Sequence, residues 1–490
     1  MVFRHVDELI VSVWGSEVGV LYRNPQREGQ CLFEYSPSWV RDGVNLSPLG
    51  LRFNPADPQG PPAHGNDDDR AAWHGVPALL ADSVPDDFGN RVIDAALARE
   101  GVSLADISAL DRLAYVGERG MGALVFEPSR THNFTPTAIN LSDLVSEARE
   151  LLRGNLDGDS RNAALTDIIL TGTSAGGARA KAVIAWNRET SEVRAGNLPL
   201  PAGAVGFEQW LIKFDGINKG DYGLSDPTGQ TRAEHVYALM AKQADIQMSE
   251  TLLLDEGPRS HFMTRRFDRP GVDGERLHVQ TLNALAGMNF KYERSYSYEQ
   301  VFTAMRDVGV FTPDDLEQMF RRAVFNVLAS NNDDHTKNWA FLMDPAGRWR
   351  LAPAYDLSFA YKPDHRYIGQ HFLSINGKFD GHGLTDLHAL GNAVGWQVPD
   401  IKGNIERVAD AVSRFSTLAR EWEVPTALAS KISTRIDAIC REVGLTGVTL
   451  PTGPSGASRG ATTTKSGGYC GKRTADGTPC RNHKDACPHH

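Results

Sequence analysis

The chain has 490 residues, of which 41% are hydrophobic and 23% are charged, and its formal net charge is −10. This composition is close to the globular average and excludes collagen-like, coiled-coil and wholly disordered proteins. No stretch approaches the ~20 apolar residues that a membrane-spanning helix needs, and the N-terminus lacks the apolar segment of a signal peptide. Five cysteines are too few for a disulfide scaffold. We therefore expect a cytoplasmic protein of two or three domains without a membrane partner.

The charge is distributed unevenly along the chain. Residues 447–490 hold six Lys or Arg against two Asp or Glu, whereas the preceding 446 residues hold 45 against 59. An acidic body argues against a broad nucleic-acid surface but leaves room for a local basic patch. The basic tail could form such a patch, or it could fold back onto the acidic body.

The first part of the chain has the pattern of β-structure. Strand-like runs separated by polar turns lie at residues 9–14, 18–22 and 31–35. A surface loop rich in Pro, Gly and Asp follows at 54–70. Two helical patterns around 89–112 and a Gly-rich β-segment at 116–126 come next, and we place a domain boundary near 130–165.

The middle of the chain alternates between strands and helices. Three strands are predicted at residues 167–170, 182–186 and 210–214. A helix follows at 233–244 and a further strand at 262–267.

The clearest helical pattern lies at residues 314–330. Its apolar residues alternate at spacings of three and one, which places them on one buried stripe of an α-helix. They are Leu316, Met319, Phe320, Ala323, Val324, Val327 and Leu328. A β-hairpin is predicted at 339–343 and 349–351, and helical structure at 404–443. Residues 447–468 are mostly Gly, Ser, Thr, Pro and Ala, which predicts a flexible linker.

A Gly-rich segment, Thr171–Lys181, lies between two of the predicted strands. Its small residues let backbone N–H groups approach phosphate oxygens, and Arg179 or Lys181 would add positive charge. It is not a Walker A loop, because its lysine is not followed by Ser or Thr and a strand comes next. Protein kinases cover ATP phosphates with such a loop between antiparallel strands, but an ordinary hairpin is the commoner meaning of a Gly/Ser run.

Lys213 stands inside the predicted strand 210–214 between apolar residues. Burying an unpaired lysine costs several kcal/mol, so a buried Lys213 would need an anion; a strand with Lys213 facing water fits the pattern equally well. Glu234, in the next predicted helix, could pair with Lys213 as a kinase glutamate does. We slightly favour the alternative, in which Glu234 interacts with the helix dipole.

The polar run Ser330–Asn338 lies between a strongly buried helix and an apolar strand, where a loop is held against the core. Asp333 and Asn338 are separated by four residues, as in kinase catalytic loops, where the Asp accepts the substrate hydroxyl proton and the Asn binds Mg²⁺. Asp356 follows 18 residues after Asn338, in the place of a D-F-G aspartate. Each feature alone has a plainer explanation as a turn or a cap. Their common order favours a kinase.

The order and spacing of these motifs resemble the HipA family of bacterial toxin–antitoxin Ser/Thr kinases. The matching segments are Trp14–Leu21, Pro85–Gly89, Met121–Leu124, Thr173–Lys181, the strand with Lys213, Arg266–Arg269, Asn332–Asn338 and Pro353–Leu357. The resemblance covers about residues 5–445. It implies an α+β, bilobal, protein-kinase-like fold with a β-rich N-terminal subdomain and an α-helical C-terminal lobe.

The expected domains follow from this resemblance and from the composition of the tail. They are a β-rich N-terminal domain at 1–130, an N-lobe at 131–270, an α-helical C-lobe at 271–446, a flexible linker at 447–468 and a tail at 469–490.

The resemblance also implies roles for individual residues. Asp333 would be the catalytic base, Asn338 and Asp356 the Mg²⁺ ligands, and Lys213 a contact to the ATP phosphates. Further ATP contacts would come from Ser174, Gly176, Gly177, Lys181, Phe267 and Asp268. Family members phosphorylate a serine in the Gly-rich loop, and Ser174 occupies that place. A phosphate there adds nearly two negative charges beside the ATP phosphates, so we expect it to inhibit the protein.

The activity implied by the resemblance is that of an ATP- and Mg²⁺-dependent Ser/Thr protein kinase toxin that also phosphorylates itself. Its expected partners are a helix-turn-helix antitoxin, operator DNA bound through that antitoxin, and an aminoacyl-tRNA synthetase as the protein substrate. Two alternatives stay open. One is a kinase-fold binding protein that nucleotide or an antitoxin switches, and the other is a kinase of small molecules.

The C-terminal tail departs from the family pattern. Residues 470–490 contain three of the five Cys and three of the 15 His. A tetrahedral Zn²⁺ site with Cys470, Cys480, Cys487 and His489 as ligands would let so short a segment fold. His483 and His490 are further candidate ligands. The spacing is not that of a standard CxxC pair, and the alternative is a disordered tail with incidental thiols.

Overall fold

The structure is a computed structural model of the whole chain. It describes residues 4–57, 62–65, 70–85, 87–99, 101–130, 144, 181–196, 205–216, 228–256, 259–271, 275–394 and 398–445. The predicted strand 167–170, the Gly-rich loop up to residue 180 and the whole tail from residue 446 lie outside these ranges. None of the helices within them combines the length and hydropathy that a bilayer span requires.

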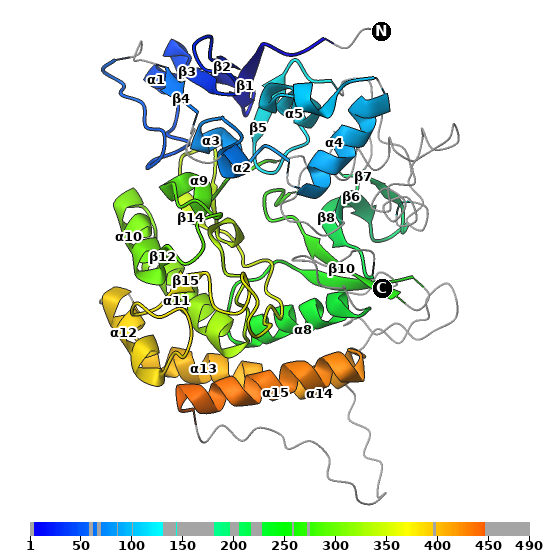
Figure 1. Cartoon of the computed structure of the whole chain (residues 1–490), viewed down its shortest axis with the longest axis vertical. Helices are drawn as coiled ribbons and strands as arrows, with labels where there is room; N and C mark the ends of the chain where they lie inside the picture. Colours follow the sequence, from blue (N-terminus) through cyan, green and yellow to red (C-terminus); the bar gives the residue numbers. More distant parts are fainter. Residues whose placement is uncertain are drawn as a thin grey trace, which may run out of the picture.

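The N-terminal part forms a five-stranded sheet in the order β4-β3-β2-β1-β5. Its strands are β1 (Glu8–Val13), β2 (Ser16–Arg23), β3 (Cys31–Tyr35), β4 (Ala63–His64) and β5 (Leu124–Glu127). Buried and exposed residues alternate along β1, so that one face of the sheet contacts the core. In Figure 1 this sheet lies at the top of the molecule, next to the short helices of the same region.

Five helices accompany the first sheet. They are α1 (Pro37–Asp42), α2 (Arg70–Trp73), α3 (Ala78–Ala81), α4 (Asp87–Arg99) and α5 (Ala109–Val116), with a 3-10 turn at Leu104–Asp106. The three strands predicted here and the two helical patterns are confirmed. The prediction of β-structure throughout 116–126 is wrong, because Gly117 and Gly122 have φ of 53° and 78° and only Leu124–Glu127 is extended.

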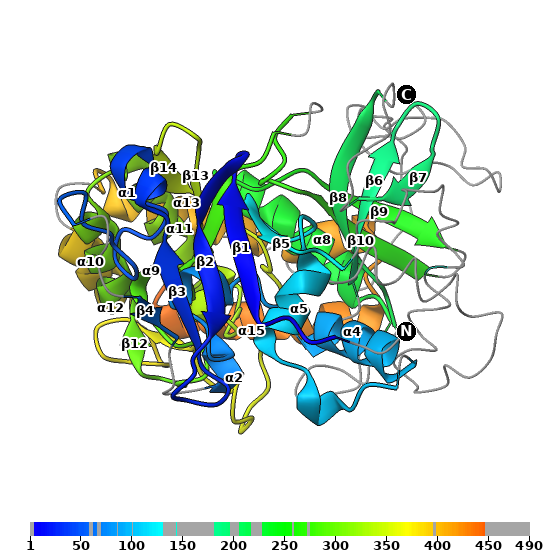
Figure 2. The same ribbon diagram turned by 90° about the horizontal axis from the view of Figure 1, so that it is seen from above.

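A second sheet has the order β7-β6-β8-β10-β9. Its strands are β6 (Lys181–Asn187), β7 (Val193–Ala195), β8 (Phe207–Lys213), β9 (Thr251–Glu256) and β10 (Arg259–Arg265). Every residue of β6 is buried, so both faces of this strand, which lies between β7 and β8, are covered. Helix α8 (Gln230–Gln243) packs against β9 and β10, and Figure 2 shows the sheet on the opposite side of the molecule from β3 and α1. The strands predicted at 182–186, 210–214 and 262–267 and the helix at 233–244 are confirmed.

Helices are the main regular elements of the remaining described residues. The helices are α9 (Leu282–Ala286), α10 (Tyr298–Val308), α11 (Pro313–Leu328), α12 (Leu384–Val394), α13 (Ile401–Ser413), α14 (Phe415–Glu421) and α15 (Thr426–Val443). Short strands β11 (His278–Thr281), β13 (Ala340–Met343) and β14 (Trp349–Leu351) form one sheet, and β12 (Tyr296–Ser297) pairs with β15 (Leu373–Ser374). The hairpin predicted from 339 to 351 is thus confirmed.

Helix α11 has both a well-defined start and a buried apolar stripe, which explains its regular pattern of apolar residues. Thr312 and Asp315 form a capping box at its start, with Pro313 in the first turn. All seven residues of the predicted apolar stripe are buried, and they belong to a core cluster that also contains residues of β1, α8 and α15. The helical stretch predicted at 404–443 consists of α13, α14 and α15, with breaks at Arg414 and before Thr426. These three helices form the base of the molecule in Figure 1.

Candidate active site

The loop after α11 carries two adjacent aspartates in different surroundings. Asp333 keeps 33% of its side chain exposed, and His335 Nε2 lies 3.9 Å from its Oδ1. Asp334 is buried and accepts hydrogen bonds from the Tyr298 hydroxyl at 2.7 Å, the Phe372 N–H at 2.7 Å and His371 Nδ1 at 3.1 Å. The Asp333 carboxylate is therefore partly accessible from solvent, whereas Asp334 fastens the segment that follows Asp356 to the loop.

The loop closes on itself at Asn338. Its amide nitrogen donates to the Asp333 carbonyl oxygen at 2.7 Å, and Trp339 Nε1 donates to the Asp334 carbonyl oxygen at 3.2 Å. The 3-10 turn Thr336–Asn338 is held further by the Thr336 hydroxyl, which donates to the Met288 carbonyl oxygen at 2.6 Å. Asn338 is thus oriented by its nitrogen, and its amide oxygen is the atom that could bind a cation.

Asp356 forms an ion pair with Lys213, and Lys213 Nζ lies 2.6 Å from Glu234 Oε1. The second sheet, α8 and the segment after β14 therefore meet at one ammonium group. Our preference for a helix-dipole role of Glu234 is wrong, because Glu234 lies in the second turn of α8 and its side chain is 3% exposed and paired with Lys213. Of the two alternatives left open for Lys213, the structure shows the buried lysine that is paired with anions.

The charges of this cluster stabilise one another. Burial alone would lower the pKa of Lys213, but the carboxylates of Asp356 and Glu234 reverse this and raise it. Burial likewise acts to raise the pKa of Asp356, but Lys213 and Lys181 outweigh it and lower the pKa to about 2. Asp356 also has a φ of 53°, a left-handed conformation that a non-glycine residue adopts only when its surroundings enforce it.

Lys181 lies directly opposite Lys213 in the antiparallel register of β6 and β8. Both lysines are buried, with 3% and 7% of their surfaces exposed. Like charges directly opposite in a sheet repel, so this pair favours the presence of anions on the same face. Lys181 is the first residue of β6, and it directly follows the Gly-rich segment in the sequence.

Tyr355 connects three segments of the candidate site. Its hydroxyl donates to the Lys337 carbonyl oxygen at 2.6 Å, and its ring lies 5.7 Å from that of Phe267, between centroids. Sequence reasoning missed Tyr355 and Asp334. Both are neighbours of singled-out aspartates, but the sequence contains no signal that distinguishes a buried from an exposed member of such a pair.

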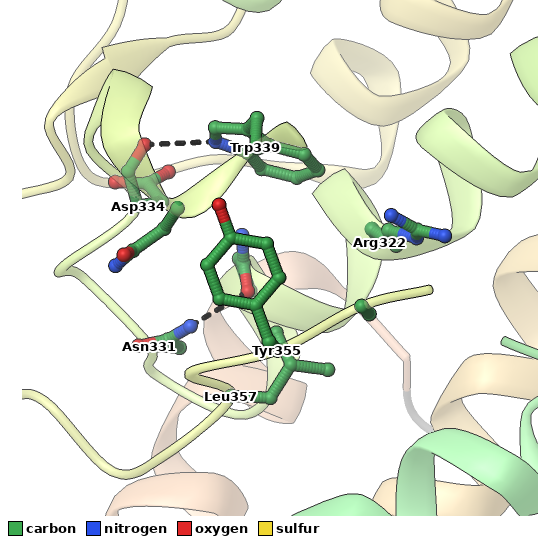
Figure 3. Close-up of a pocket in the computed structure, with 9 residues that line it drawn as sticks. Arg322, Asn331, Asp334, Trp339, Tyr355 and Leu357 are labelled. Carbon is green, nitrogen blue, oxygen red and sulfur yellow. Dashed lines mark hydrogen bonds between the residues drawn. The ribbon is translucent and has the colours of Figure 1, made fainter. Parts of the chain in front are cut away.

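Behind the loop lies a small cavity of about 10 Å³ (Figure 3). It is lined by Arg322, Asn326, Asn331, Asp334, Asn338, Trp339, Ala354, Tyr355 and Leu357. Asn331 donates to Asn326 Oδ1 at 2.9 Å, one of the dashed lines in the figure. The cavity has room for about one water molecule. It is too small for a nucleotide and therefore belongs to the packing that supports the loop.

Asp268 is buried and paired with two arginines. Its buried carboxylate accepts hydrogen bonds from Arg266, Arg269 and the Gly122 N–H, the last at 2.8 Å. Burial acts to raise its pKa, but the two arginines and the Gly122 donor lower it overall. Arg276 adds hydrogen bonds to the carbonyl oxygens of Glu118 and Gly122. This arrangement fastens the segment after β10 to the N-terminal part, and the nucleotide contacts of Phe267 and Asp268 stay predictions.

The donor set at this site fits Mg²⁺ and a nucleotide. Asn338 and Asp356 offer an amide oxygen and a carboxylate, which are hard oxygen ligands that Mg²⁺ accepts when phosphates and waters complete its shell. Lys181 and Lys213 are buried cations that suit phosphate oxygens. No group of three or more His, Cys, Asp or Glu side chains suited to a metal occurs among the described residues.

Family comparisons agree with this geometry. A model of the HipA-like C-terminal domain matches residues 173–416, and a model of the HipA N-terminal domain matches residues 9–127. The chain belongs to the HipA family. The resemblance inferred from the motifs is thus confirmed, and the two matches together cover well over half of the chain.

Two curated relatives of this HipA family member share part of its sequence. A protein of Haemophilus influenzae that is named as a kinase is 28% identical over 171 residues, covering 30% of this chain and 49% of the relative. The serine/threonine-protein kinase toxin HipA of Shewanella oneidensis is 26% identical over 196 residues, covering 36% and 45%. The chain therefore spans about half the length of the curated relatives it matches.

A solved structure supports the fold. HipA in the complex of Shewanella oneidensis HipA, HipB and operator DNA superimposes with a TM-score of 0.60 at 17% identity, over 88% of this chain and 96% of that one. At this identity the likeness shows the fold alone. The mixed α/β architecture expected from the sequence is confirmed, while the division into lobes and the domain limits stay predictions.

Several predicted site residues lie outside the described ranges. They are Ser174, Gly176, Gly177, Cys470, Cys480, Cys487 and His489, together with the further candidates His483 and His490. The family models also end before the tail. The zinc site therefore stays a prediction without support from the comparisons.

Proposed function

We propose that this protein is an ATP- and Mg²⁺-dependent serine/threonine protein kinase of the toxin–antitoxin type. The observation that carries the proposal is the ion cluster of Lys213, Glu234 and Asp356, which stands next to a loop that presents Asp333 and Asn338. Two buried lysines opposite each other and two paired carboxylates are costly to assemble in a protein interior. Binding of phosphate groups by the two lysines would account for this costly arrangement.

Each residue then has a defined task. Lys213, held by Glu234, donates hydrogen bonds to phosphate oxygens, and Lys181 adds a second positive charge on the same face. Asn338 and Asp356 hold Mg²⁺, which neutralises the phosphate charge when bound. Asp333 accepts the proton of the attacking Ser or Thr hydroxyl at its exposed carboxylate.

The remaining expectations rest on family membership. Ser174 is proposed as an autophosphorylation site whose phosphate inhibits the protein through repulsion of the ATP phosphates. By analogy with the HipA–HipB–DNA complex, a DNA-binding antitoxin is proposed as the partner. An aminoacyl-tRNA synthetase is the proposed substrate, and the cytoplasm the proposed location.

The proposal is tested by transfer of labelled γ-phosphate from Mg·ATP, by the purified protein alone and with bacterial lysate. Asp333→Asn is the inactivating variant, and Asp364→Asn, an exposed aspartate outside the site, is the matched control. Labelling of a discrete lysate protein by wild type and Asp364→Asn, but not by Asp333→Asn, supports the proposal. Labelling of the enzyme alone leaves Ser174 as the site to map by mass spectrometry.

A second candidate is a kinase-fold binding protein that nucleotide or an antitoxin switches. The ion pair between Lys213 and Asp356 favours this second candidate, because a nucleotide that binds to either group must rearrange the pair. ATP binding with no transfer to any protein, in wild type as in Asp333→Asn, would establish this candidate in place of the kinase.

A further inference from the structure

A carboxylate of the N-terminal part reaches the segment that packs against the candidate catalytic loop. Asp82, at the end of α3, accepts hydrogen bonds from the Thr281 N–H at 2.7 Å and the Thr281 hydroxyl at 2.8 Å. Both donors belong to one residue, so the carboxylate clamps the junction between β11 and α9. This contact joins residues 199 positions apart in the chain.

Thr281 is also the N-cap of α9. Its hydroxyl accepts a hydrogen bond from the Ala284 N–H at 3.4 Å, so the same oxygen donates to Asp82 and caps the helix. A short helix of five residues depends strongly on such contacts, because isolated helices of this length are not stable in water. Asp82 therefore determines where α9 begins.

Helix α9 in turn holds both ends of the turn that carries Asn338. At its start, the Leu282 N–H donates to the Trp339 carbonyl oxygen at 2.7 Å, and Thr281 pairs with Ala340 in the β11–β13 register. After its end, the Met288 carbonyl oxygen accepts from the Thr336 hydroxyl at 2.6 Å. A shift of α9 would therefore move the turn Thr336–Asn338 from both sides.

Electrostatics connect the same groups. Burial raises the pKa of Asp82, and the Lys337 ammonium and the two Thr281 donors oppose that rise. Lys337 lies within the 3-10 turn, directly before Asn338. The carboxylate thus interacts with the loop through charge as well as through α9.

We propose that Asp82 is a positioning residue of the kinase reaction, through which the N-terminal part holds the turn Thr336–Asn338 in the geometry that Asn338 needs to bind its cation. The inference rests on the proposed role of Asn338. It makes the N-terminal part a support of the active site in addition to any role in binding partners.

The simpler alternative is that Asp82 only stabilises the interface. Another contact across that interface, the hydrogen bond of 2.9 Å between His278 and the Leu46 carbonyl oxygen, is made by β11 and involves neither α9 nor the side chains of the turn Thr336–Asn338. A useful control is Asp111, a buried carboxylate that accepts from Val6, His5 and Ser108, all within the N-terminal part. Asp111→Asn disturbs that part without touching α9.

The first experiment is amide hydrogen exchange of the nucleotide-free full chain, compared among wild type, Asp82→Asn, Thr281→Val and Asp111→Asn. We expect exchange in residues 333–339 to rise roughly tenfold in Asp82→Asn and Thr281→Val and to stay within about twofold of wild type in Asp111→Asn. Unchanged exchange in that segment in both variants, or the same increase in Asp111→Asn, would overturn the inference. If Asp82→Asn does not fold, Thr281→Val decides, because it removes the hydroxyl at constant volume.

The second experiment measures phosphotransfer against Mg²⁺ concentration. Asp82→Asn is expected to raise the Mg²⁺ midpoint and lower kcat by roughly tenfold each while the KM for ATP stays within about twofold. A proportional loss at all Mg²⁺ concentrations would mark a merely structural role and overturn the inference. Hydrogen exchange does not require phosphotransfer. If the proposed function is wrong, the wild type will therefore be inactive while the expected differences in exchange among the variants remain.

Discussion

The Tyr355 hydroxyl donates a hydrogen bond of 2.6 Å to the carbonyl oxygen of Lys337. Tyr355 directly precedes Asp356, and Lys337 directly precedes Asn338. One hydrogen bond therefore fixes the spacing of the two proposed cation ligands, although they belong to different segments. Tyr355 is buried enough that its pKa lies well above the ordinary value, so the hydroxyl remains a donor over the whole physiological range.

Replacing Tyr355 with Phe removes this bond and leaves the Lys337 carbonyl oxygen without that donor. We expect the free energy of unfolding to fall by about 1 kcal/mol and the Mg²⁺ requirement of phosphotransfer to rise severalfold. Urea unfolding and Mg²⁺ titrations measure the two effects. Tyr361→Phe, which keeps the ring that Arg435 covers, is the matched control and should leave both quantities near wild type. An unchanged Mg²⁺ requirement in Tyr355→Phe would contradict the proposed spacing role.

Replacing Lys213 with Met leaves Glu234 and Asp356 without the ammonium group between them. Breaking a buried ion pair by removing one partner costs about 3 kcal/mol or more, and the Glu234 side chain is only 3% exposed. We therefore expect a large loss of stability in thermal melting together with loss of ATP binding. The double variant Lys213→Met/Glu234→Gln should recover part of the stability but none of the binding. Recovery of ATP binding in the double variant would argue against a phosphate contact by Lys213.

The Asp356 carboxylate predicts a specific pH dependence of stability. Its pKa is lowered to about 2 in the folded protein, so it stabilises the fold above its ordinary pKa and loses this effect as the pH falls toward 2. The difference in unfolding free energy between wild type and Asp356→Asn should shrink by at most about 1 kcal/mol between neutral pH and about pH 3, because the side chain is 30% exposed and solvent screens the pair. Urea titrations at several pH values measure it. A difference that grows on acidification would contradict the ion pair.

We expect substitution of Asp333 to affect phosphotransfer and substitution of Asp334 to affect stability. Asp334→Asn weakens the buried acceptor of Tyr298, His371 and Phe372, and we expect a loss of about 2 kcal/mol and faster proteolysis within residues 357–382. Asp333→Asn should abolish phosphotransfer with little change in the melting temperature. If the two variants exchanged these effects, Asp334 would be the base and our assignment would be wrong.

The tail prediction concerns metal content. If Cys470, Cys480, Cys487 and His489 bind Zn²⁺, the purified full chain should contain about one equivalent of zinc, and Cys480→Ser should lose it. Deletion of residues 466–490 should remove the zinc and leave the melting of the remaining chain unchanged. Less than about half an equivalent in the full chain would favour the disordered tail.

The sequence by itself determined much of the local structure. The three-and-one spacing of α11, the hairpin from 339 to 351 and the strands around Lys213 followed from periodicity, because side-chain burial repeats with the period of the element. The spacing of Asp333, Asn338 and Asp356 likewise contributed to the resemblance to the HipA family, which the family models confirm, while the roles of these residues stay predictions.

The tertiary structure alone decided which polar groups are buried and what they contact. The sequence does not distinguish the partly exposed Asp333 from the buried Asp334, and it does not show that two arginines enclose Asp268. The preference for a helix-dipole role of Glu234 was wrong because its partner, Lys213, lies on another element. Burial and pairing depend on contacts between distant segments, such as Asp82 with Thr281, and no local pattern encodes them.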